Sequence, residues 1–79
     1  MFEILETIRS ELQIAEQEKR KVTTFHFLVL KHASVLNKVD KYEFCDAVGM
    51  KESFVAEFDK MIRLAKHLET EGVILAKPI

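Results

Sequence analysis

The chain has 79 residues, of which 48% are hydrophobic and 32% charged, and its formal net charge is -1. This length allows a single domain over residues 1–79 with one core, and the apolar content excludes a disordered tail. The longest uncharged run, residues 22–30, is about half the length that crosses a bilayer, and the acidic start lacks the basic flank of a signal peptide, so we expect a cytoplasmic protein without a membrane segment.

Charge is distributed unevenly along the chain. Residues 1–17 carry four glutamates and one arginine, whereas residues 18–41 carry six basic and only two acidic side chains. Residues 42–79 return to seven acidic and five basic side chains. An anionic partner would therefore meet the middle of the chain first.

The N-terminal stretch predicts a helix over residues 1–21. Its apolar side chains recur at steps of three and four and form one stripe: Phe2, Leu5, Ile8, Leu12 and Ala15. Two roles remain open for this helix, which either covers the core of its own subunit or packs against the same helix of a partner. We favour a homodimer through Phe2, Leu5, Ile8 and Leu12, because a short chain gains most from extra buried surface.

A second helix is expected to begin at Thr23 or Thr24, either of which can act as its N-cap, and to end in a left-handed turn at Asn37. It is apolar around most of its circumference, so it should lie in the middle of the bundle. Asp40 and Glu43 then have the spacing of a capping box for a third, short helix. The inner face of this third helix is expected to consist of Tyr42, Phe44, Cys45 and Val48.

Two glycines mark the remaining boundaries. Gly49 is expected to end the third helix, because glycine reaches the positive φ angle of such a turn without steric cost. The fourth helix should cover residues 52–70, with Gly72 after it and a short β-prone run at residues 73–75 that Pro78 ends. The sequence therefore predicts an all-α fold, a small bundle of four helices, with a short C-terminal β-strand as an optional addition.

The region around Gly49 resembles the helix-turn-helix motif of bacterial transcription regulators. That motif has a window of twenty residues, with apolar residues at places four, eight, ten, fifteen and eighteen, a small residue at place five and glycine at place nine. A window that starts at Lys41 supplies all seven: Phe44, Val48, Met50, Val55, Phe58, Cys45 and Gly49. The small residue lets the two helices approach closely, and the glycine turns the chain without strain.

The resemblance covers residues 25–75 and extends to winged-helix regulators, in which an apolar strand follows the last helix. It implies a tri-helical core within residues 24–75 that binds double-stranded DNA and regulates transcription. Residues 51–63 would lie near the major groove, and the basic segment 19–41 would lie on the phosphate backbone. The residues that the resemblance assigns to DNA are Lys38, Lys41, Lys51, Ser53, Lys60 and Arg63.

Two alternatives remain open beside this interpretation. A generic corner between two helices satisfies the same spacing, and a protein-interaction module on the same scaffold would not bind DNA at all. Glu52 and Glu57 lie among the expected contact residues, and a carboxylate beside a phosphate is unfavourable by about 1 kcal/mol in water. From the resemblance, duplex DNA and a second copy of the chain are still the expected partners, with a protein partner as the alternative.

The sequence offers no set of residues for catalysis. Cys45 is the only cysteine, so no internal disulfide can form, and no basic neighbour in sequence would stabilise its thiolate. His26 and His32 are six residues apart, which is not the spacing at which two histidines on a helix chelate a metal ion. We expect no enzymatic activity, no cofactor and no bound metal.

Overall fold

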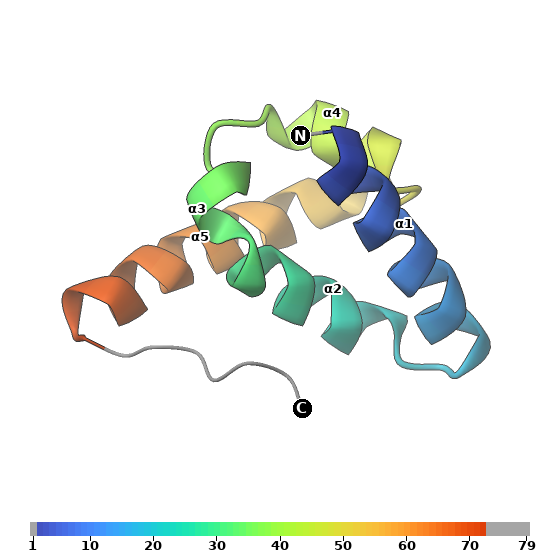
Figure 1. Ribbon diagram of the computed structural model, residues 1–79, viewed down its shortest axis with the longest axis horizontal. Helices are drawn as coiled ribbons and strands as arrows, with labels where there is room; N and C mark the ends of the chain where they lie inside the picture. Colours follow the sequence, from blue (N-terminus) through green and yellow to red (C-terminus); the bar gives the residue numbers. More distant parts are fainter. Residues whose placement is uncertain (1, 73–79) are drawn as a thin grey trace.

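The structure, a computed structural model, describes residues 2–72. Its elements are α1 (Phe2–Gln17), α2 (Lys21–Lys31), α3 (Ala33–Leu36), α4 (Lys41–Ala47), the 3-10 turn η1 (Glu52–Phe54) and α5 (Val55–Thr70). This helical architecture confirms the all-α prediction, and Figure 1 shows α1, α2 and α5 as its long elements. The strand expected at residues 73–75 lies outside the described residues.

The first helix ends four residues earlier than the sequence predicts. Lys19 adopts a left-handed conformation with a φ angle of 61°, which reverses the chain directly after Gln17. The backbone amides of Lys19 and Arg20 donate back to the carbonyls of Glu16 and Ala15, at 3.1 and 2.9 Å. These two hydrogen bonds close the helix in the manner that usually requires glycine.

The second predicted helix begins earlier and is divided. Thr23 and Thr24 lie inside α2, so the prediction that one of them caps the helix is wrong. The backbone bends at His32, where φ is -105° and ψ is 16°, and this bend separates α2 from α3. Asn37 has a right-handed φ of -63°, so the expected left-handed turn at this residue is also wrong.

The start and the end of α4 agree with the sequence. Asp40 caps the helix, because its Oδ2 atom accepts a hydrogen bond of 2.9 Å from the amide of Glu43. Gly49 has a φ angle of 77°, and the amides of Gly49 and Met50 donate back to the last turn of α4, at 3.2 and 2.8 Å. This turn sets the path from α4 into η1 and α5.

One expected inner residue of α4 points outward. Phe44, Cys45 and Val48 are buried as predicted, but the side chain of Tyr42 is 54% exposed. Tyr42 precedes Phe44 by two residues, which places the two side chains about 200° apart around the helix. With Phe44 in the core, Tyr42 has to face solvent.

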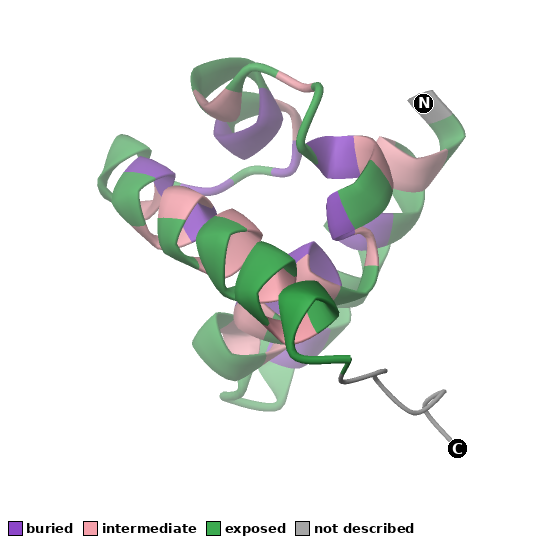
Figure 2. Ribbon diagram, turned by 90° about the vertical axis from the view of Figure 1, so that its left-hand side faces the viewer, coloured by how far each residue is buried: buried purple, intermediate pink, exposed green. Residues whose placement is uncertain are grey.

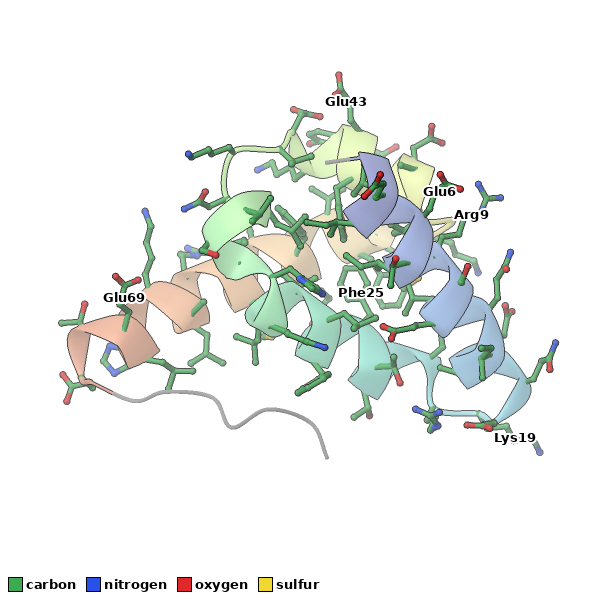
Figure 3. All side chains as sticks on the ribbon, viewed as in Figure 1. Glu6, Arg9, Lys19, Phe25, Glu43 and Glu69 are labelled. Atoms are coloured by element: carbon green, nitrogen blue, oxygen red, sulfur yellow. The ribbon has the colours of Figure 1, made fainter. Side chains whose placement is uncertain are left out.

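Phenylalanines from four elements fix how α2, α4 and α5 pack. The ring of Phe25 on α2 lies 6.1 Å from the ring of Phe44 and 5.5 Å from that of Phe54. The ring of Phe44 lies 4.7 Å from that of Phe58 on α5. Figure 3 shows Phe25 in the middle of the molecule, and its ring lies beside rings of α4 and η1. Such ring contacts add to the large apolar area that each phenylalanine buries.

The first helix covers the core of its own chain. Ile8 and Leu12 are 0% and 1% exposed, and Leu5 packs against the same core, because α1 lies across α2 and α4. This placement corrects the expected dimer interface, since Ile8 and Leu12 are already buried within one subunit. The side chain of Phe2, the fourth residue of that interface, lies outside the described part.

Candidate nucleic-acid interface

One side of α5 faces away from all other helices. Val55 and Phe58 point into the core, and a rotation of about 100° per residue puts a row of exposed residues on the opposite side. We call this row the α5 outer stripe, and it consists of Ser53 of η1 and of Ala56, Lys60, Arg63 and His67 of α5. Figure 2 shows exposed residues along this side of α5.

The α5 outer stripe carries two cations, Lys60 and Arg63, and no carboxylate. From Ser53 to His67 it extends over about 21 Å, the rise of fourteen helical residues. A helix of ordinary diameter, about 10 to 12 Å, fits the major groove of B-DNA, which is about 12 Å wide. In size and charge the stripe is therefore suited to lie against duplex DNA.

Glu57 lies at one edge of the stripe and is turned toward α2. Its Oε1 atom lies 3.0 Å from Nε2 of His26, and its Oε2 atom accepts a hydrogen bond of 3.2 Å from Nζ of Lys60. The hydrogen bonds from Lys60 and His26 lower the pKa of the Glu57 carboxyl. A carboxylate that would repel DNA from the centre of the stripe thus joins α5 to α2.

Asp59 lies beyond the other edge of the stripe and is turned toward α4. Its Oδ2 atom accepts a hydrogen bond of 2.9 Å from Nζ of Lys41. This hydrogen bond, together with the negative charge of Asp59, raises the pKa of the Lys41 ammonium. Lys41 is expected from the sequence to contact DNA, and the structure places it in an ion pair between the two helices of the motif.

The other residues assigned to DNA by resemblance are exposed but do not all gather at one place. Ser53 and Arg63 lie on the α5 outer stripe together with Lys60, and Lys51 precedes η1 at the start of the stripe. Lys38 lies in the connection between α3 and α4. The structure thus brings three of the six residues onto one line and places Lys51 beside it.

The basic cluster at the start of α2 lies elsewhere. Figure 3 shows Lys19 at the turn between α1 and α2, at the opposite end of the molecule from Glu69 in α5. Arg20 forms an ion pair of 2.5 Å with Glu18 in the turn, and Lys21 forms one of 3.6 Å with Glu16 at the end of α1. These side chains serve the turn between α1 and α2.

Sequence reasoning missed the two side-chain pairs that join α5 to its neighbours, the contact between His26 and Glu57 and the ion pair between Lys41 and Asp59. The partners His26 and Glu57 are 31 residues apart, and Lys41 and Asp59 are 18 apart, so no local spacing relates them. The signal that could have predicted these pairs was the angular position of each residue around the α5 helix. Counted from the core-facing Phe58, both carboxylates fall outside the centre of the exposed side of α5, toward its flanking helices.

The remaining chemically reactive groups are unremarkable within residues 2–72. Cys45 is 1% exposed, and its burial raises the pKa of the thiol, which disfavours the nucleophilic thiolate. In this range no three His, Cys, Asp or Glu side chains gather closely enough to hold a metal ion. The same range contains no helix with the length and apolar character that a membrane crossing requires.

Residues 2–71 match a family model described as an HTH-like domain. The match therefore includes α1 and both helices of the helix-turn-helix region, α4 and α5. No curated protein and no solved structure matches the chain.

Proposed function

The chain belongs to the HTH-like domain family, and from this premise we propose that it binds double-stranded DNA through the α5 outer stripe and regulates transcription. The observation that carries the proposal is that positive and negative side chains lie on different sides of α5. Lys60 and Arg63 lie on the outward line, while Glu57 and Asp59 lie to its sides and pair with α2 and α4.

Each cation of the stripe has a role that its chemistry suits. Arg63 presents a planar fork of donors that fits a guanine edge or a phosphate. Lys60 and Lys51 supply compact positive charge for phosphates, which position a protein on the duplex without reading its sequence. The small side chains of Ser53 and Ala56 leave room for the start of the helix to approach the groove.

The two cross-helix side-chain pairs give the proposed interface a fixed orientation before DNA arrives. Glu57 joins α5 to α2, and Asp59 joins it to α4, on either side of the outward line. A surface that is already held in its binding geometry loses less conformational freedom on association. The proposal therefore assigns positioning roles to Glu57 and Asp59 and contact roles to Lys60 and Arg63.

We further propose that the protein acts as a homodimer, because a two-fold protein matches the two half-sites of a palindromic operator. Its proposed action is non-enzymatic, and its proposed location is the cytoplasm. The finer resemblance to winged regulators of bacteria stays a prediction.

A protein-binding module is the second candidate function. Leu64, one turn after Lys60, is 39% exposed beside the stripe, and Tyr42 on α4 is 54% exposed. Large exposed apolar side chains are typical of surfaces that bind other proteins. On this alternative, the same side of α5 would contact a protein in place of DNA.

Fluorescence anisotropy with a labelled duplex of random sequence separates the two candidates. DNA binding predicts saturation at low salt and an affinity that falls linearly with salt on logarithmic axes, because phosphate contacts release counterions. Without binding at about 100 µM, the weak end of nonspecific affinity, the DNA proposal fails and the protein-binding candidate replaces it.

A further inference from the structure

We propose that the groove between α1 and α2 is the surface through which two copies of this chain associate. The groove has a volume of about 460 Å³, and it is lined by residues of both helices, among them Glu11, Ile14, Phe27, Leu28 and Lys31. The inference deepens the proposed homodimer and names its interface. It does not depend on DNA binding, because none of the residues that line the groove belongs to α5.

The groove exposes apolar side chains from both of its walls. Ile14 on α1 is 54% exposed and Phe27 on α2 is 37% exposed, while Leu28 beside them is 3% exposed and belongs to the core. Contiguous apolar surface between polar neighbours is typical of a protein contact, and aromatic residues are enriched at the centres of such contacts. Association would remove Ile14 and Phe27 from water.

Opposite charges lie on the two walls. Glu11 comes from α1 and Lys31 from α2, and neither forms an ion pair with another described residue. Both side chains line the same groove. Glu11 and Lys31 thus present opposite charges without an ion pair to another described residue, while Arg20, the third charged residue of the groove, pairs with Glu18.

A second copy satisfies both charges at once. In a two-fold interface residue i contacts residue j and j contacts i, so an axis between Glu11 and Lys31 brings each beside the opposite charge of the partner. The dimer would hold two such ion pairs around a centre of Ile14 and Phe27. A uniformly acidic or basic partner would match only one of the two charges and would repel the other.

Sedimentation equilibrium of the full chain tests the interface through charge reversal. Glu11→Lys and Lys31→Glu each place like charges together in the homodimer, so each variant alone should raise the dimer Kd at least about 10-fold. An equimolar mixture of the two variants pairs opposite charges again and should recover most of the lost affinity. Phe27→Ser should weaken the dimer at least as much as either reversal, with circular dichroism confirming that the helices persist.

Three results would overturn the inference: a wild-type chain that stays monomeric at about 1 mM, reversals that leave the Kd unchanged, or a mixture without recovery. The test is separate from DNA binding. If the chain dimerises in this way but does not bind duplex DNA, only the proposed DNA function is wrong. If the chain binds DNA but stays monomeric, only the inferred interface is wrong.

Discussion

The ammonium of Lys41 lies 2.9 Å from the Oδ2 atom of Asp59 and joins the two helices of the helix-turn-helix region. On the other side of α5, Glu57 makes the equivalent connection to His26 of α2. Each pair uses a carboxylate that would otherwise oppose DNA. Glu57, one of the two acidic residues that count against DNA binding in the sequence alone, thus becomes part of the scaffold that presents Lys60 and Arg63, whereas Glu52 stays exposed in η1 without an ion pair to another described residue.

Replacing Lys41 should weaken the scaffold. Lys41→Met removes the ion pair with Asp59 and leaves that carboxylate without its partner, so we expect a lower midpoint of thermal unfolding. Lys38→Met is the matched control, because Lys38 is exposed and lies outside α4. Circular dichroism melts of both variants measure the difference. Equal midpoints for the two variants would show that the pair does not stabilise the fold.

The pair between Glu57 and its partners should make stability depend on acid pH. The pKa of Glu57 is lowered in the folded state, so the unfolded chain binds its proton first as the pH falls. Its stabilisation is therefore complete above the ordinary pKa of 4.5 and is lost as the pH falls through the lower folded value. Urea unfolding between about pH 6 and pH 3 should show this slope, and Glu57→Gln should reduce it.

The control for that experiment is Glu6→Gln on α1, an exposed residue outside the described ion pairs. Figure 3 shows Glu6 on α1. If Glu57→Gln and Glu6→Gln change the acid slope equally, the assignment to Glu57 is wrong.

Two turns with the same hydrogen bonds should respond oppositely to substitution. Gly49 and Lys19 both have positive φ angles, 77° and 61°, after α4 and α1. A side chain in this conformation costs about 1 to 2 kcal/mol, while glycine loses about 0.5 to 1 kcal/mol more entropy on folding than alanine does. Gly49→Ala should therefore destabilise the fold by about 1 kcal/mol, and Lys19→Gly should stabilise it by up to about 1 kcal/mol.

Contacts with other parts of the chain do not complicate the Gly49 experiment, because an added Cβ atom there would have no atom within 4 Å apart from those of Gly49 and its two chain neighbours. Chemical denaturation of the two variants gives the free energies of unfolding directly. Changes of the same sign at both positions would contradict the backbone explanation.

Much of the fold was predictable because its determinants are local. The apolar spacing around Phe58 located the last helix, and Gly49 and Asp40 marked the boundaries of α4 through preferences of single residue types. Lys19 was not predictable in this way, because lysine has no preference for the left-handed conformation that the backbone hydrogen bonds impose on it.

The candidate site was only partly predictable. The outward positions of Ser53, Lys60 and Arg63 follow from helical spacing once the core face is known. Whether Lys41 is free for DNA depends on Asp59, which comes 18 residues later and meets it only through tertiary packing. Whether α1 covers the core of its own chain depends on how α2 and α4 pack. The spacing of apolar residues along α1 does not show this.

Phe25 and Phe27 offer a matched test of the core. Phe25 is 0% exposed among rings of α4 and η1, whereas Phe27, two residues later on α2, is 37% exposed. Phe25→Ala should cost about 3 to 5 kcal/mol, enough to unfold a small domain, while Phe27→Ala should cost much less in a monomer. Denaturation at low protein concentration compares them, and similar losses would contradict the described core.

The most direct test of the central claim compares two arginine reversals in a DNA titration. Arg63→Glu alters the α5 outer stripe, and Arg9→Glu makes the same charge change on α1, which does not contact α5. Anisotropy titrations with duplex DNA over a range of salt concentrations should show at least about a 10-fold loss of affinity for Arg63→Glu, with a salt slope reduced by about 1, and little change for Arg9→Glu. Equal losses for the two variants, or no loss for Arg63→Glu, would contradict DNA binding through α5.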